Sequence, residues 1–153
     1  MNKINIVAVG KMKEDYYAAA ANEYIKRLSP YCKLKITEIS PCKLPDNPTQ
    51  KEIEAALLKE ESLILPQIKG TAFCLDIGGK KYTSEDFSRE IAAAEEITFV
   101  IGGSHGLSDG VKTACRKRIS FSDMTFPHRL FRVMLLEQIY RAKQIENGKA
   151  YHK

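Results

Sequence analysis

Short apolar runs alternate with longer segments of helical periodicity along most of the chain. Four segments have the apolar or alternating pattern expected of strands: 4–9, 34–39, 71–77 and 97–101. Apolar residues recur at helical spacing over 17–28 and 48–64, and a shorter helix is expected after Thr83. Strands separated by helices of this length indicate βαβ units. The sequence therefore predicts an α/β fold with an open, mostly parallel sheet.

Several boundaries of these elements are marked by particular residues. Pro48 suits the first turn of a helix, where no N–H donor is needed. The spacing from Thr83 to Asp86 resembles a capping box. Gly78 and Gly79 are expected to end the third strand and to turn the chain toward Thr83.

Composition indicates an ordinary globular protein. The chain has 153 residues, of which 44% are hydrophobic, 28% charged and 8% aromatic. This length and hydrophobic content suit one domain over 1–153, whose core needs neither disulfides nor metal. The net charge is +5 and the sequence pI is about 9.0, so the surface attracts polyanions such as nucleic acid. Basic composition alone does not identify the partner.

Metal binding, secretion and membrane insertion are not predicted. The four cysteines contain no C-x-x-C pair, and the three histidines lie far from them in the sequence. The apolar run 4–9 is too short for the hydrophobic region of a signal peptide. No segment approaches the roughly 20 apolar residues that a membrane span requires. The expected location is the cytoplasm.

Glycines follow directly on the strand 97–101, in the order Gly102-Gly103-Ser104-His105-Gly106. Glycines in this position allow a ligand to approach the backbone at the carboxyl end of a parallel strand. They are equally compatible with a plain tight turn between strand and helix. The order does not match G-x-G-x-x-G, and the segment 78–81 lacks the upstream glycine of a P-loop, so neither phosphate-binding motif is predicted.

A second candidate segment, 119–128, mixes hydroxyl, apolar and aromatic side chains. Such a loop can enclose an adenine ring and bind its edge through backbone groups. The alternative is a structured connection that buries Phe121, Met124 and Phe126 in the core. The helix expected over 128–147 is apolar around much of its circumference, and a homodimer interface is one way to cover the excess.

Polar residues of this helix and of the tail that follows it are candidates for RNA contact. Glu137 and Arg141 have the i, i+4 spacing of an ordinary surface ion pair. Basic side chains such as Arg129 can meet phosphates. The tail Tyr151-His152-Lys153 offers a ring, donors and charge to a nucleotide, although most chain termini fray.

Six segments taken together resemble the RlmH (YbeA-like) family of SPOUT-class ribosomal RNA methyltransferases, and the resemblance extends over essentially the full length. The segments are Val7–Lys11, Phe73–Lys80, Phe99–Gly106, Ser120–His128, Arg132–Ala142 and Tyr151–Lys153. The resemblance implies a SPOUT α/β fold with a C-terminal trefoil knot, a homodimer, and S-adenosylmethionine as methyl donor. It also implies that the enzyme methylates N3 of a pseudouridine in 23S ribosomal RNA. The implied target is pseudouridine-1915 in helix 69, and the implied substrate is the large subunit or the assembled 70S ribosome.

By position, the resemblance places the methyl donor against eight residues: Leu75, Gly102, Phe121, Ser122, Asp123, Met124, Thr125 and Phe126. Because the sulfonium is already an activated donor, no covalent nucleophile is needed. Our hypothesis is that Glu137, Arg141 and His152 organise removal of the N3 proton. Four further residues are expected to hold RNA: Arg129, Arg132, Tyr151 and Lys153. The tail is expected to complete the site of the partner protomer.

Two other functions are compatible with parts of the sequence. A noncatalytic RNA-binding module accounts for the basic charge and the basic C-terminal helix, but not for the glycine turn and the loop after it. A small α/β enzyme that uses another nucleotide is disfavoured by the absent phosphate-binding motifs. Binding of S-adenosylmethionine separates these functions from a methyltransferase.

Overall fold

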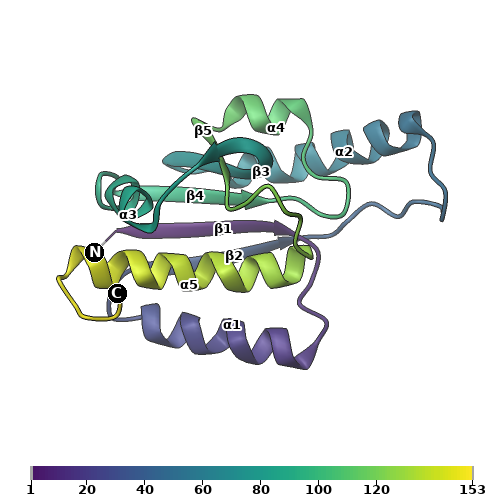
Figure 1. Cartoon of the computed structure of the whole chain (residues 1–153). Coiled ribbons are helices and arrows are strands. Elements are labelled where there is room, and N and C mark those ends of the chain that lie inside the picture. The colour runs from purple at the N-terminus through teal and green to yellow at the C-terminus, as the bar shows by residue number, and fades with distance from the viewer. Residues whose placement is uncertain (1, 153) are drawn as a thin grey trace.

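A parallel sheet forms the centre of the computed structural model, which describes residues 2–152 (Figure 1). Within these residues the sheet has five strands in the order β2-β1-β4-β3-β5, and every neighbouring pair is parallel. The strands are β1 (Lys3–Val9), β2 (Lys33–Ile39), β3 (Thr71–Lys81), β4 (Glu96–Ile101) and β5 (Lys117–Ser120). The mostly parallel α/β sheet predicted from the sequence is confirmed.

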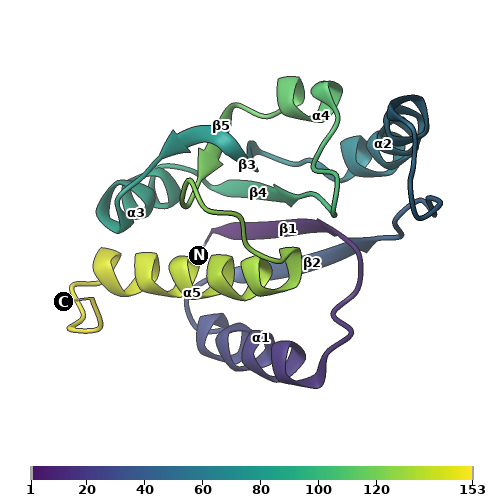
Figure 2. The same ribbon diagram turned by 45° about the vertical axis from the view of Figure 1, so that its right-hand side comes forward.

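Helices cover both faces of the sheet (Figures 1 and 2). They are α1 (Asp15–Leu28), α2 (Gln50–Ile64), α3 (Ser84–Ala92), α4 (Asp109–Ala114) and α5 (His128–Glu146), with a 3-10 turn at Leu65–Gln67. Helix α5 packs between α1 and α3 on one face, while α2 and α4 lie on the other. Side chains of β1 therefore alternate between two buried layers, with Ile4 and Ile6 in one and Val7 and Val9 in the other.

Two predicted boundaries are wrong for identifiable reasons. Gly78 and Gly79 do not end the third strand, because β3 continues to Lys81; they lie within its register shift against β5, between Leu75 and Lys80. A Cβ on Gly79 would lie 2.6 Å from the backbone of Arg118, so the glycine permits a close approach of two strands. Pro48 precedes the second helix rather than starting it.

The start of that helix is fixed by a capping box at Thr49. The Thr49 hydroxyl accepts from the Glu52 amide at 3.2 Å, and the Glu52 carboxylate accepts from the Thr49 amide at 3.1 Å. The predicted cap at Thr83 is confirmed, since its hydroxyl accepts from the Asp86 amide at 3.0 Å and α3 follows.

The wide apolar surface of α5 is largely covered within one chain. Leu135, Leu136 and Ile139 are completely buried in the layer that α5 shares with the sheet, and α1 and α3 flank the helix. The breadth of the apolar pattern therefore does not by itself require a second copy. The homodimer and the trefoil knot stay predictions. No helix within residues 2–152 has the length and apolar content to cross a membrane.

Candidate active site

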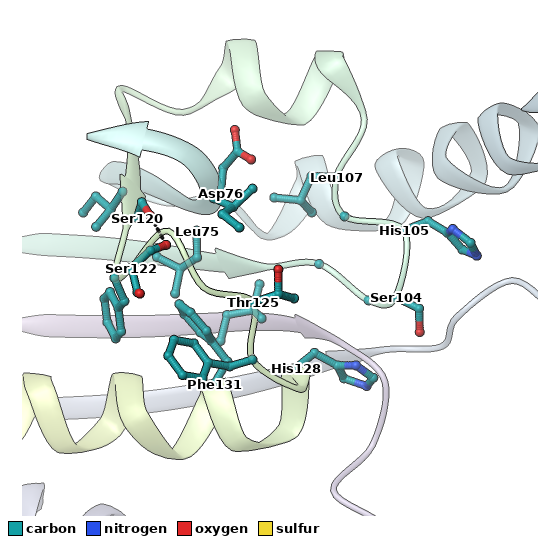
Figure 3. Close-up of a pocket in the computed structure, with 18 of the residues that line it drawn as sticks. Leu75, Asp76, Ser104, His105, Leu107, Ser120, Ser122, Thr125, His128 and Phe131 are labelled. Carbon is teal, nitrogen blue, oxygen red and sulfur yellow. Dashed lines mark hydrogen bonds between the residues drawn. The ribbon is translucent and has the colours of Figure 1, made fainter. Parts of the chain in front are cut away.

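A cavity of about 440 Å³ opens at the carboxyl ends of β3, β4 and β5 (Figure 3). Its walls come from five parts of the chain: β3 around Leu75, the turn 102–107 after β4, Lys112 of α4, the segment 119–126 that includes the end of β5, and the first turn of α5. Loops at the carboxyl ends of parallel strands are where α/β proteins hold ligands. The cavity is large enough for a nucleoside-sized molecule.

The glycine turn forms one wall, and its conformation requires glycine. The Gly106 amide donates to the Gly103 carbonyl at 3.1 Å, and Gly106 has φ +77°. A Cβ on Gly102 would lie 2.4 Å from the Gly106 carbonyl oxygen, closer than any side chain tolerates. The turn is therefore folded back on itself, and the backbone of Gly102 and Gly103 lines the cavity.

The loop after β5 forms the opposite wall and is held by its own hydroxyls. Ser120 Oγ donates to the Ser122 carbonyl at 2.9 Å, and the Met124 amide donates to Ser122 Oγ at 3.0 Å. Both serines line the cavity (Figure 3). The Asp123 carboxylate is turned away and pairs with Lys81 Nζ.

The structure brings seven of the eight residues expected against the donor into this one cavity: Leu75, Gly102, Phe121, Ser122, Met124, Thr125 and Phe126. Asp123 is not among them. Aromatic rings give this wall an apolar surface, because the Phe121 and Phe131 ring centroids are 4.7 Å apart and Phe126 lies 6.4 Å from Phe131. Such a surface suits one face of a planar base.

Charged groups at the cavity are already paired. Asp76 lies 3.4 Å from Arg118 and 3.8 Å from Lys112, with its side chain only 15% exposed. Burial, together with the positive charges of Arg129 and Arg132, lowers the pKa of His128 below its usual value, so its imidazole is neutral at pH 7. The imidazoles of His105 and His128 lie on the outer side of the cavity residues (Figure 3). Residues 2–152 contain no cluster of metal-ligating side chains.

The glycine turn is anchored where it enters α4. Ser108 caps this helix, accepting from the Val111 amide at 3.2 Å and donating to Glu61 Oε1 at 2.7 Å. Gly110 leaves room for that carboxylate, because a Cβ there would lie 1.9 Å from Glu61 Oε1. Helix α2 therefore holds the end of the turn that lines the cavity.

We expect Ser108→Ala to lower the free energy of unfolding by about 1 kcal/mol, because the Val111 amide and the Glu61 carboxylate each lose a partner. Urea unfolding measures this change. Ser62→Ala is the control, since its exposed hydroxyl only donates to the Lys59 carbonyl and its loss should change stability by less than about 0.5 kcal/mol. Equal effects of the two substitutions would contradict the proposed anchor.

The three residues expected to be catalytic form one cluster with the tail. Arg141 donates to Glu137 Oε1 through Nε at 3.0 Å and Nη2 at 2.6 Å, and the Tyr151 hydroxyl donates to the same oxygen at 3.2 Å. Arg141 Nη1 lies 3.1 Å from His152 Nδ1, and His152 Nε2 lies 2.7 Å from Glu85. Since a guanidinium only donates, Nδ1 accepts and the imidazole proton is on Nε2.

Electrostatics hold this cluster in fixed charge states. The hydrogen bonds that Arg141 donates to the Glu137 carboxylate raise the pKa of Arg141 above its usual value. Burial and the negative charge of Glu137 raise the pKa of Tyr151 to about 12, so its hydroxyl keeps its proton at neutral pH. The guanidinium also lies over the Tyr151 ring, 4.9 Å from its centroid.

The cluster and the cavity lie at opposite ends of α5. The helix starts at the cavity and runs back along the sheet, so the C-terminal tail lies beyond the amino ends of the strands (Figures 1 and 2). Ten residues separate Phe131 from Arg141, which corresponds to roughly 15 Å of helix. Within one chain, the expected catalytic residues are not at the cavity.

The residues expected to hold RNA are mostly engaged elsewhere. Arg132 is 4% exposed and binds the Gly10 carbonyl at 2.9 Å and Glu38 at 2.6 Å. Arg129 binds the Lys11 carbonyl at 2.9 Å. Both guanidinium groups therefore form hydrogen bonds with the chain after β1 and are less available to bind phosphates. Tyr151 belongs to the tail cluster, and Lys153 lies outside the described residues.

Some cavity residues were not expected from the sequence. Asp76 directly follows Leu75 at the end of an expected strand, so its position was a usable signal. Phe131 was expected only on the apolar side of a helix, and Lys112 carries no local pattern that points to the cavity. Both come to the site through packing of elements that are distant in the sequence.

The comparisons with known proteins agree with this architecture. A family model described as "Predicted SPOUT methyltransferase" matches residues 2–152. A probable methylase family protein from Haemophilus influenzae Rd KW20 has a similar fold, with a TM-score of 0.61 and 11% identity over 99% of this chain and 71% of that one. The chain is a SPOUT methyltransferase.

Its relatives narrow the family further. Proteins named ribosomal RNA large subunit methyltransferase H from Clostridium botulinum (strain Kyoto / Type A2) and Clostridium tetani (strain Massachusetts / E88) are each 51% identical to it. Each alignment covers 98% of this chain and 99% of the relative. The chain therefore belongs to the ribosomal RNA large subunit methyltransferase H (RlmH) family.

Proposed function

We propose that this protein transfers the methyl group of S-adenosylmethionine to N3 of a pseudouridine in 23S ribosomal RNA, pseudouridine-1915 in helix 69. The observation that carries the proposal is the cavity at the carboxyl ends of β3, β4 and β5, in a chain of the RlmH family. Its proposed substrate is the large subunit, free or in the 70S ribosome, and its proposed location is therefore the cytoplasm.

The cavity residues suit S-adenosylmethionine. Leu75 and the Phe121 and Phe131 rings provide an apolar surface for the adenine, and the Gly102-Gly103 backbone allows close approach of the rest of the molecule. Ser122, Thr125 and neighbouring backbone groups are available for its polar edges. When bound there, the sulfonium supplies an activated methyl group, so the protein's own task is to align donor and acceptor and to exclude water.

The tail cluster supplies the groups needed at the acceptor. N3 of the base must lose a proton, and a positive charge near the ring stabilises the developing anion. Arg141 provides this charge, and Glu137 and Tyr151 fix its orientation by their hydrogen bonds. His152 is the candidate to receive the proton at Nδ1, after the base has displaced Arg141 Nη1 from that nitrogen. In this mechanism Glu137 positions Arg141, while Arg141 and His152 contact the base.

Two copies of the chain are required to bring donor and acceptor groups together. The cavity and the tail cluster are separated by roughly 15 Å of helix within one chain. A homodimer with two-fold symmetry can place the tail of each protomer beside the cavity of the other, which gives two equivalent active sites. We infer that each active site combines the cavity of one protomer with the tail cluster of its partner.

Mixing two inactive variants tests this arrangement. With S-adenosylmethionine held between the dissociation constants of the unaltered protein and of Gly102→Ala, the cavity of Gly102→Ala is largely empty. Arg141→Ala impairs the tail cluster, so a randomly reassociated equal mixture contains heterodimers with one intact site. We expect the mixture to recover about a quarter of the unaltered activity, because about half of the dimers carry one of two sites. No recovery after confirmed exchange of subunits would show that cavity and tail act within one chain.

The reaction itself is tested by transfer of labelled methyl groups. Tritiated S-adenosylmethionine is supplied with 70S ribosomes, separated subunits or free ribosomal RNA from a strain without its own RlmH-type enzyme. We expect label in 23S RNA of ribosomes, at the N3 position after nucleoside analysis, and little label in short free stem-loops. Ribosome binding without donor binding or methyl transfer would instead indicate a noncatalytic RNA-binding module.

A further inference from the structure

Basic side chains gather along the open edge of the sheet formed by β5. We define the β5-edge cluster as Lys80, Lys81, Lys112, Arg116, Lys117 and Arg118. Strand pairing explains why residues so distant in sequence meet there, since Lys80 lies opposite Ile119 and Lys81 opposite Ser120. Strand β5 is the last strand of the sheet, and within residues 2–152 no further strand covers this edge.

Neighbouring carboxylates neutralise only half of the positive charge of the cluster. The carboxylates that pair with it are Asp76, Glu90 and Asp123, which leaves a local charge of +3, compared with +5 for the whole chain. Within the described residues, neither Lys80 nor Arg116 forms an ion pair, and both are exposed. Lys80 instead lies over the Tyr82 ring, 5.2 Å from its centroid.

The cluster is continuous with the cavity that we propose holds the methyl donor, called the donor cavity below. Lys112 and its partner Asp76 line the cavity, and so do Ile119 and Ser120 of β5. A polyanion lying along this edge would therefore pass directly beside the bound methyl donor. The arginines at the start of α5 do not offer such a surface, because Arg129 and Arg132 are bound to the chain after β1.

We propose that the β5-edge cluster is a phosphate-binding surface, which holds the ribosomal RNA backbone beside the donor cavity. This inference rests on the proposed function and adds the surface that docks the substrate. Phosphate contacts position a nucleic acid without reading its sequence. The surface would therefore fix the distance between the RNA strand and the cavity, while the choice of nucleotide is made at the reacting base.

Exposed lysines also prevent edge strands from pairing with other sheets. The opposite edge of this sheet provides a direct comparison, because β2 carries the exposed residues Lys33 and Lys35. If edge protection were the only role of such cations, removing charge from either edge would have the same effect on RNA binding. The β2 lysines lie outside the cavity lining, so they serve as matched controls.

Salt dependence of ribosome binding tests the proposal. The full-length protein, with S-adenosylmethionine bound, is titrated against purified 70S ribosomes at fixed Mg²⁺ and KCl from about 50 to 250 mM. The variants are Lys80→Gln/Arg116→Gln on the β5 edge and Lys33→Gln/Lys35→Gln on the β2 edge. Each lost phosphate contact should reduce the slope of log Kd against log salt by roughly 0.9, so the β5-edge variant should lose about 2 in slope. With equal affinities extrapolated to 1 M salt, it should bind roughly 60-fold more weakly at 0.1 M salt.

Thermal unfolding checks that both variants are folded, and titration with S-adenosylmethionine checks that their cavity is intact. An unchanged slope of log Kd against log salt in the β5-edge variant, or an equal loss of slope in the β2-edge control, would overturn the proposed surface. The proposed function would stand in that case, because the protein would still bind ribosomes. Failure of the unaltered protein to bind ribosomes at any salt concentration would overturn the proposed function, and the surface with it.

Discussion

Replacement of Gly102 by alanine is expected to weaken binding of S-adenosylmethionine at least about tenfold. The added Cβ would lie 2.4 Å from the Gly106 carbonyl oxygen, and 2.6 Å from the adjoining carbonyl carbon. Neither atom belongs to a flexible side chain, so the backbone of the turn must move. Overpacking of this kind costs about 1–3 kcal/mol, and at this position the displaced backbone is itself a wall of the cavity.

Isothermal titration calorimetry of the purified variant measures the loss. Gly78→Ala is the matched control, because a Cβ there meets only Asp76 Oδ2 at 3.8 Å, which is ordinary contact, and Gly78 is not part of the cavity lining. We expect the control to bind the donor as the unaltered protein does. Unchanged affinity in Gly102→Ala would mean that the turn does not contact the donor.

Replacement of Arg141 by alanine is expected to lower kcat for methyl transfer about a hundredfold at saturating ribosomes. The substitution removes the positive charge that we place beside the developing anion, and it frees Glu137 and His152 from their partner. Affinity for S-adenosylmethionine should not change, because Arg141 is remote from the cavity of its own chain and approaches only the reacting base of the partner's site. Arg141→Lys should restore part of kcat, since the charge returns without the two-point contact to Glu137.

The control for this experiment is Arg89→Ala, which removes an arginine that pairs with Asp86 on the surface of α3. Its side chain is 72% exposed, so the loss should leave kcat within about twofold. Single-turnover measurements separate methyl transfer from product release. If Arg141→Ala and His152→Ala both retained full turnover, the tail cluster would have only a structural role.

The position of the tail cluster is the reason why our proposal requires two protomers. Glu137, Arg141 and Tyr151 form one hydrogen-bonded group between the middle of α5 and the tail, and the cavity lies at the start of α5. Because α5 is a straight, well-packed helix, neither end can move to the other within one protomer. Catalysis and dimerisation are therefore linked in our proposal, and conditions that separate the protomers should abolish methyl transfer without abolishing donor binding.

The sequence by itself determined most of the local structure. Apolar runs such as Ile97–Ile101 predicted the central strands, because strands of a parallel sheet are buried on both faces. Thr83 predicted a helix start, because its hydroxyl satisfies a free amide of the first turn. The residues expected to contact the methyl donor were inferred from the resemblance to a family. The structure places all of them except Asp123 at one cavity.

Only the tertiary structure decided which side chains are available. The sequence presents Arg132 as a basic residue on a helix, yet packing buries it against Gly10 and Glu38. Gly79 permits two strands to approach and does not end the third strand. Strand pairing brings Lys80 and Lys81 of β3 beside the basic residues of β5. Local patterns cannot encode such relations, because each depends on segments that are distant in the sequence and meet only in the folded chain.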